Sequence, residues 1–136
     1  MKIRNLIQDK LDNLLLKDGI MSHHIRRVEV DVITDADGKQ IDINNDEYVV
    51  YRVVSSKKRF YADGKAIGSQ FFIDINYYYH YDKNNSQVDV AEKRIKSIID
   101  ELLTDTHFKV SNNQNDLPDL DNYYRGINVE FSYIGV

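Results

Sequence analysis

The segment Phe71–Tyr81 constrains the fold of this chain more than any other. Its odd-numbered residues are all apolar or aromatic, and its even-numbered residues include Asp74, Asn76 and His80. A period of two is the pattern of a β-strand with one covered face and one wetter face. At about 3.3 Å per residue the segment spans about 35 Å, which exceeds the usual strand length. We therefore expect a sheet built around one long strand that projects beyond the core.

Three other segments also have strand character. Glu47–Val54 is dense in β-branched and aromatic residues, which predicts a strand covered on both faces. A short strand is expected at Phe108–Val110. Apolar residues alternate with polar ones from Ile127 to Tyr133, and this pattern predicts a closing strand with one wet face.

A hairpin is expected between the first helix and Glu47. Valine alternates with charged residues over 28–32, Asp35–Gly38 has turn chemistry, and alternation resumes over 41–43. The turn also resembles a fragment of a calcium loop, in which closely spaced carboxylates precede a glycine. In that alignment Ile33 and Asn44 would occupy positions that need Asp or Glu. We therefore interpret the segment as a turn and not as a metal site.

Apolar residues fall on one helical stripe in two segments, Lys2–Leu16 and Val88–Leu103. The first helix is expected to end near Gly19, and Ser86 is the expected N-cap of the second. Strands on both sides of a strong helix predict the α+β class, with an antiparallel or mixed sheet of about five strands and both helices packed on one face. A chain of 136 residues fits one domain, 1–136.

Composition narrows the classes of function. The formal net charge of −4 gives no field that would hold a polyanion by itself. The absence of cysteine excludes a disulfide framework, a thiolate zinc site and a cysteine nucleophile. The apolar runs are far shorter than the roughly 20 residues that span a bilayer, and Met1 opens into an amphipathic pattern instead of a signal peptide. We expect a soluble cytoplasmic protein without a membrane partner.

Residues with catalytic or ligating chemistry do not form a motif. His23 and His24 are adjacent on an extended segment and would point to opposite faces, while His80 and His107 are isolated in the sequence. There is no Gly-x-Ser-x-Gly elbow and no phosphate-binding glycine loop. We therefore expect no enzyme activity, no cofactor, no metal and no small-molecule substrate. An unrecognised hydrolase or metal-dependent enzyme stays an alternative, and a tightly bound metal would be its sign.

Two predicted loops carry opposite formal charge. The loop 55–68 has four cations against one acid and a net charge of +3, and the loop 111–122 has three acids and a net charge of −3. In a head-to-tail oligomer the basic loop of one subunit would meet the acidic loop of the next. Two solvated loops with incidental charges are the open alternative. With exposed tyrosine as an anchor, the interface hypothesis names Lys57, Lys58, Arg59, Lys65, Tyr78, His80, Asp116, Asp119 and Asp121.

The tyrosine-rich run Tyr77–Tyr81 supports a second function class. Next to the basic loop 57–65 it could form a stacking platform for single-stranded nucleic acid. Consecutive strand residues point to opposite faces, so only part of the run can share one surface. A small nucleic-acid-binding module therefore stays the alternative to a protein contact surface.

The order of segments resembles that of a known family. An N-terminal helix, the strand at Glu47, a basic loop, the long strand Phe71–Tyr81, the helix Val88–Leu103 and the closing strand Gly126–Ile134 look like the small tail-completion and tail-terminator proteins of long-tailed siphophages. The likeness is greatest to the head-to-tail joining proteins of phages that infect Gram-positive bacteria. It covers nearly the whole chain, but no short motif fixes an alignment.

The resemblance implies a structural role in the virion tail. Such proteins cap the finished tail tube, form a ring that is commonly a hexamer, and dock onto the head connector. The implied partners are other copies of the chain, the tail tube protein and a head connector or stopper protein. The implied location is the virion, after assembly in the host cytoplasm. Neither catalysis nor a cofactor is implied.

Overall fold

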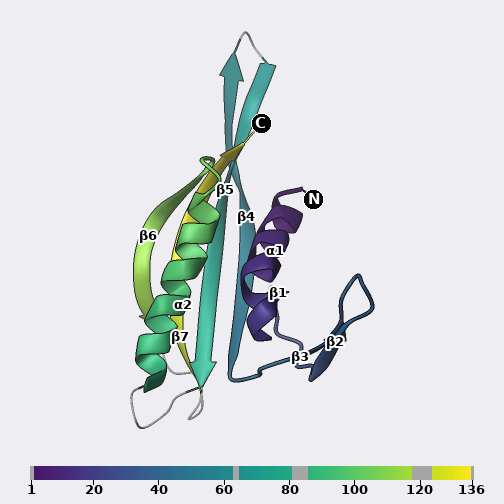
Figure 1. The fold of residues 1–136 in the computed structure, drawn as a ribbon. Helices are drawn as coiled ribbons and strands as arrows, with labels where there is room; N and C mark the ends of the chain where they lie inside the picture. Colours follow the sequence, from purple (N-terminus) through teal and green to yellow (C-terminus); the bar gives the residue numbers. More distant parts are fainter. Residues whose placement is uncertain (1, 63–64, 81–85, 118–123, 136) are drawn as a thin grey trace.

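The computed structural model describes residues 2–62, 65–80, 86–117 and 124–135 (Figure 1). Two helices and two sheets account for most of them, in the order α1 (Lys2–Leu15), a 3-10 turn (Leu16–Asp18), β1 (Met21–His24), β2 (Val32–Thr34), β3 (Gln40–Asp42), β4 (Glu47–Ala62), β5 (Lys65–His80), α2 (Ser86–Leu103), β6 (Phe108–Leu117) and β7 (Tyr124–Gly135).

The main sheet has five strands in the order β1-β4-β5-β7-β6. β1 pairs with β4 in parallel, and the other three neighbouring pairs are antiparallel. The sheet is therefore mixed, and α1 and α2 lie side by side on one of its faces (Figure 1). The predicted α+β class, with about five strands and both helices on one face, is confirmed.

Cross-strand register explains which sheet residues form the core. Ile73, Ile75 and Tyr77 of β5 lie beneath the helices and are fully buried. Their partners on β4 and β7 share this face, because residues opposite one another in a ladder point to the same side. The predicted alternation of the long strand is thus confirmed over the described residues. Both helices cover this face with one apolar stripe each, made of Ile3, Ile7, Leu11 and Leu15 in α1 and Ala91, Ile95, Ile98 and Leu102 in α2.

Helix α1 ends where the sequence predicts. Gly19 adopts a left-handed conformation with φ of 74°, and its N–H donates to the Leu16 carbonyl at 2.9 Å. A Cβ at this position would lie 2.6 Å from the carbonyl oxygen of Asp42. Glycine is therefore required both by the backbone angle and by the close passage of the segment after β3.

Polar side chains also attach α1 to the sheet. The Tyr51 hydroxyl donates to Gln8 Oε1 at 2.7 Å, and Gln8 Nε2 donates to the Ser22 carbonyl and to Asp12 Oδ1, each at 3.0 Å. One glutamine on the helix therefore joins β4, β1 and its own helix. This arrangement fixes α1 over the β1 edge of the sheet.

The predicted basic loop 55–68 is wrong, because these residues continue β4 and begin β5. Cross-strand pairing runs from Glu47↔Tyr79 to Ala62↔Lys65, with irregularities between Ser55 and Arg59 and between Phe60 and Tyr61. Backbone pairing with β5 overrides the weak strand propensity of a serine- and lysine-rich segment. The two residues between Ala62 and Lys65 are Asp-Gly, the pair favoured in two-residue hairpin turns, which is the local sequence signal for this hairpin.

The predicted acidic loop 111–122 is wrong in its first half. β6 extends from Phe108 to Leu117, so the short strand predicted at 108–110 is much longer. Pairing with β7 continues through the polar run with two register shifts, between Val110 and Asn112 and between Asn112 and Asn115. Such bulges let a strand keep its partner across residues with poor strand propensity. Residues 118–122 lie outside the described part of the chain.

Three smaller differences concern the N-terminal half. β1 was not predicted; it is short and lies at an edge. The β2–β3 hairpin is confirmed, but its first strand begins at Val32, since 28–31 precede the ladder and Val28 is exposed. Asp35 Oδ1 accepts from the N–H groups of Asp37 and Lys39, so the turn reading of this segment holds. The prediction that the strand Glu47–Val54 is covered on both faces is wrong, because the helices cover only one face of β4, and Arg52 and Val54 on its other face are exposed.

Candidate assembly surfaces

The β4–β5 hairpin extends beyond the ends of both helices and forms the longest projection of the molecule (Figure 1). β5 keeps its β7 partner only as far as Ser69↔Gly135. The predicted contact residues Lys57, Lys58 and Arg59 belong to the outer half of β4, and Lys65 begins β5. The structure thus places the four basic positions together on one hairpin, while their side chains lie outside the described part.

The sheet face away from the helices, called the open face below, has an apolar patch at the base of this hairpin. Val54 is 45% exposed, Phe72 is 42% exposed and Ile134 is 40% exposed. Val54 and Phe72 are opposite each other in the β4–β5 ladder, and Ile134 lies on the neighbouring strand β7. An exposed apolar patch with polar neighbours is a candidate contact surface.

Polar pairs occupy the middle of the open face. Arg52 Nη2 lies 3.1 Å from Asp74 Oδ2, and Asn128 Nδ2 donates to Asn76 Oδ1 at 2.7 Å. In each pair the two residues lie directly opposite each other on neighbouring strands. The Arg52 side chain is 63% exposed, so this ion pair contributes little to stability. The open face is therefore wet at its centre and apolar at its hairpin end.

An aromatic cluster closes the other end of the open face. The rings of Tyr48 and Tyr78 stack at 4.9 Å, and Tyr124 meets Tyr48 edge-on at 5.4 Å. The Arg27 guanidinium lies 4.0 Å from the centre of the Tyr48 ring and also covers Tyr124 at 5.3 Å. His80 meets Tyr124 at 5.8 Å.

The predicted interface residues Tyr78 and His80 are therefore brought together, but each is half-buried within its own chain. Burial raises the pKa of Tyr78 above its usual range. On the opposite face Tyr77 is fully buried and Tyr79 is nearly so. Neither Tyr77 nor Tyr79 can serve as a stacking platform in this conformation.

A buried polar network lies beneath the helices at the same end. Glu47 is only 7% exposed and accepts the hydroxyl of Tyr77. Arg94 of α2 donates from Nε to Glu47 Oε1 at 3.2 Å and from Nη1 to Asp18 Oδ2 at 2.8 Å. Burial, together with the Glu47 carboxylate, raises the pKa of the Tyr77 hydroxyl far above its usual range.

This network joins β4, β5 and α2 through the Glu47 carboxylate, and the Arg94 guanidinium extends it to the 3-10 turn after α1. Sequence reasoning missed it, although a signal was present. Arg94 lies three residues after Ala91 and directly before Ile95, at the edge of the apolar stripe, so its charge needs a partner near the core. The network fixes the helical layer on the sheet, and its central members Glu47 and Tyr77 are buried.

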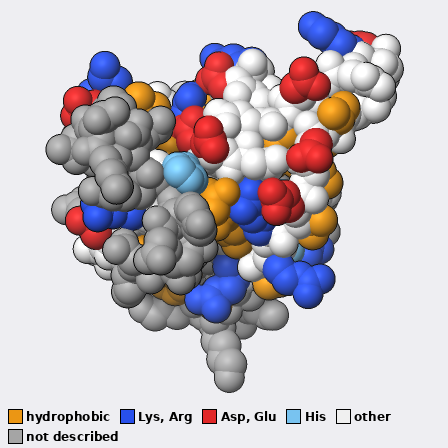
Figure 2. Space-filling model, turned by 90° about the horizontal axis from the view of Figure 1, so that it is seen from below, with side chains coloured by type: hydrophobic (Ala, Val, Ile, Leu, Met, Phe, Trp, Pro, Cys, Tyr) orange, Lys and Arg blue, Asp and Glu red, His pale blue; other side chains and the backbone are white. Residues whose placement is uncertain are grey.

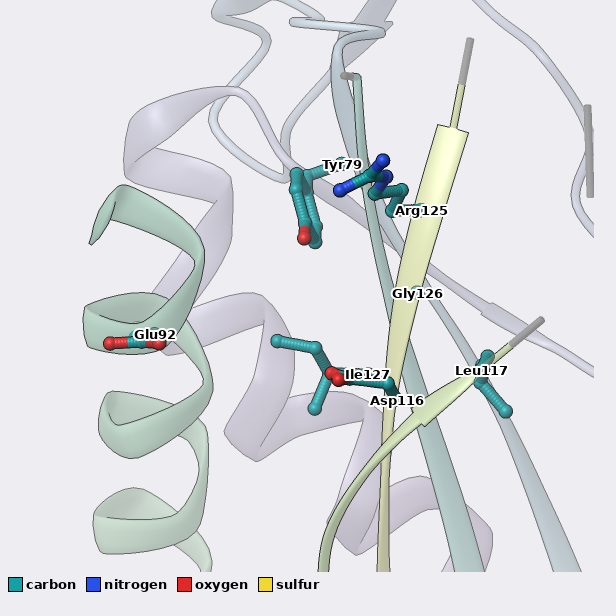
Figure 3. Close-up of a pocket in the computed structure, with 7 residues that line it drawn as sticks. All are labelled: Tyr79, Glu92, Asp116, Leu117, Arg125, Gly126 and Ile127. Atoms are coloured by element: carbon teal, nitrogen blue, oxygen red, sulfur yellow. The ribbon is translucent and has the colours of Figure 1, made fainter. Parts of the chain in front are cut away.

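An open pocket of about 320 Å³ lies between α2 and the ends of β6 and β7 (Figure 3). Its charged lining residues are Glu92, Asp116 and Arg125, each from a different element. Asp116 is one of the predicted acidic contact residues. It pairs with Ile127 of β7, and the register through β7 and β5 sets it level with Val49 of β4. Asp116 therefore lies at the end of the sheet opposite the projecting hairpin. Asp119 and Asp121 lie outside the described residues.

The basic positions of the hairpin and Asp116 thus lie at opposite ends of one sheet. The molecule seen from below shows acidic and basic side chains interspersed on that end (Figure 2). Within the described residues no group of three or more His, Cys, Asp or Glu side chains could hold a metal ion. His23 and His24 both have lowered pKa values, in each case chiefly because of desolvation.

A scan against protein-family models finds no match, and a search of curated proteins finds no significant relative. Within the described residues no helix is both long and apolar enough to cross a membrane.

Proposed function

We propose that this chain is a structural subunit of a long-tailed bacteriophage that completes the tail, caps its tube and provides the joining surface for the head. The observation that carries the proposal is the β4–β5 hairpin, which projects beyond the helical layer and has the exposed apolar residues Val54 and Phe72 at its base. A strand pair that extends past its own core leaves backbone and apolar groups to be covered by other chains.

The placement of charge supports a head-to-tail ring. The basic positions lie on the hairpin and Asp116 lies at the opposite end of the sheet, so these positions cannot meet within one molecule. Contacts of one surface with a different surface generate rings when the rotation closes. The proposed partners are other copies of the chain, the tail tube protein and a head connector or stopper protein, and a hexamer is the proposed ring.

Binding without catalysis agrees with the polar groups described above. Glu47 and Arg94 form an ion pair beneath the helices, and the Tyr77 hydroxyl donates to the Glu47 carboxylate. The open face carries paired arginine, aspartate and asparagine side chains. In this proposal the chain functions through contacts of its sheet edges and surfaces with other proteins. These contacts form in the virion tail, which is assembled in the host cytoplasm.

A stop codon early in this gene tests the proposal in a phage whose genome carries it. We expect electron micrographs of the lysate to show filled heads and separate tails, and wild-type protein supplied from a plasmid to restore joined particles. The matched control is a synonymous change at the same codon. Normal joined particles without the protein would contradict the proposal, and so would a gene located in a metabolic operon instead of between the connector and tail protein genes.

A further inference from the structure

The two outer edges of the five-stranded sheet are open over similar lengths. β1 covers β4 only between Tyr48 and Tyr51, so within the described residues the stretch Arg52–Ala62 has β5 as its sole strand partner. On the other side β6, with 10 residues, has β7 as its sole strand partner there. An edge strand of this kind is a template to which another strand can pair.

Backbone polar groups point outward at both edges. The Tyr51 carbonyl accepts from the N–H of Ile25 at 2.9 Å, on the side away from β5. Because backbone direction alternates along a strand, the polar groups of Val53 also face away from β5. The His107 carbonyl accepts from the N–H of Ile134 in β7 at 3.1 Å, so it points toward β7. By the same alternation the backbone polar groups of Val110 face away from β7.

The direction of the strands favours pairing between unlike edges. β4 is antiparallel to β5, β5 to β7 and β7 to β6, so β4 and β6 run in opposite directions. Two copies placed side by side in the same orientation therefore bring β4 of one copy antiparallel to β6 of the next. Antiparallel ladders are slightly more stable per residue than parallel ones.

Charge disfavours pairing between two β4 edges. The stretch 52–62 contains four cations and no acid, namely Arg52, Lys57, Lys58 and Arg59. A twofold contact between two such edges would set these cations beside each other, which is destabilising. The strand β6 contains one cation, Lys109, and one acid, Asp116, so its net charge is zero. A β4–β6 contact therefore avoids the repulsion between two β4 edges.

We propose that the β4 edge Arg52–Ala62 of one copy pairs antiparallel with β6 of the next copy, so that the sheets of neighbouring subunits form one continuous closed ladder. This deepens the proposed function and rests on its ring. Since β1 occupies the lower part of the β4 edge, the neighbouring copy is displaced along the strands. A closed ring accommodates such a stagger when its strands tilt relative to the ring axis.

Disulfide cross-linking tests the contact directly, because the chain has no cysteine of its own. Val54→Cys places a thiol on β4 and Asn112→Cys places one on β6, and both positions are exposed. The register of the strands places the side chains at both positions on the open face. Mixed under mild oxidation, the two single variants should form a disulfide with each other and should not cross-link when incubated singly. Lys96→Cys, exposed on α2, is the matched control and should not cross-link with either.

A proline substitution gives a second measurement. Ser55→Pro removes an N–H that points away from β5 by the same alternation, and proline is tolerated at such edge positions. We expect loss of self-association in sedimentation velocity with an unchanged far-ultraviolet circular dichroism spectrum.

The outcomes separate this contact from the proposed function. Disulfides between two Asn112→Cys chains alone would indicate a twofold β6 contact and overturn the proposal. A ring that forms without the Val54–Asn112 disulfide would overturn the edge pairing while leaving the tail-completion role intact. A chain that stays monomeric at every concentration tested contradicts pairing between copies, whereas its presence at the head–tail junction would still support the role.

Discussion

Removal of the Arg94 guanidinium is the sharpest test of how the helical layer is held on the sheet. Arg94→Met keeps most of the aliphatic part of the side chain, but it removes one donor from the Glu47 carboxylate, which keeps its hydrogen bond from the Tyr77 hydroxyl. Breaking a buried ion pair from one side typically costs about 3–5 kcal/mol. Tyr77 still compensates part of the Glu47 charge, so we expect a loss of about 2 kcal/mol in the free energy of unfolding.

Asp18 allows a matched comparison. Its side chain is 43% exposed where it meets Arg94, so solvent screens this ion pair. Asp18→Asn should therefore cost less than about 1 kcal/mol. Urea denaturation followed by circular dichroism measures both variants, and the double variant Glu47→Gln with Arg94→Met should show a coupling of about 1 kcal/mol or more. Equal losses for Arg94→Met and Asp18→Asn, or no coupling, would refute the reasoning.

Three further outcomes are expected. The pKa of Tyr77 is raised in the folded chain, so the stabilisation by its protonated hydroxyl is complete below about pH 10, where the unfolded tyrosine titrates, and is lost as the pH rises further. The urea midpoint of unfolding should therefore fall above that pH, and it should fall less steeply in Tyr77→Phe. Phe72→Asp on the open face should abolish ring assembly, measured by sedimentation, while the conservative Phe72→Tyr should retain it; loss in both variants would argue against an apolar contact. Charge reversal on the hairpin should block assembly, and lysine at the acidic positions should partly restore it, as measured with the sets Lys57→Glu, Lys58→Glu, Arg59→Glu and Asp116→Lys, Asp119→Lys, Asp121→Lys.

Long periodic segments made the fold predictable. The stripes of α1 and α2, the alternation that leads to Tyr77 and the stop at Gly19 all match the structure. In these segments the local pattern and the burial of side chains favour the same conformation, so the sequence alone predicts it correctly. The two-layer arrangement follows because each helix has only one apolar stripe to cover.

The errors arose where pairing with a distant strand decides the conformation. Ser55–Arg59 and Ser111–Leu117 have the composition of loops, yet β5 and β7 provide continuous partners for them. Such pairing depends on register between segments far apart in sequence, and composition does not reveal it. The Asp-Gly pair at 63–64 was the one local signal of the hairpin.

Side-chain chemistry was predicted less completely than the fold. Tyr78 and His80 do share the open face, but Tyr48 stacks on Tyr78 and Tyr124 meets His80 edge-on. The exposed residues Val54 and Phe72 were assigned to strands and not to a surface, because the sequence does not show which face the helices leave open. Only the register of β4 against β5 and β7 reveals that patch.

The location of the chain in mature particles tests the central claim most directly. Antibody labelling of purified virions, followed by electron microscopy, should place this protein in one ring at the head–tail junction and nowhere along the tube. Its absence from washed particles that are fully joined would contradict an assembly role.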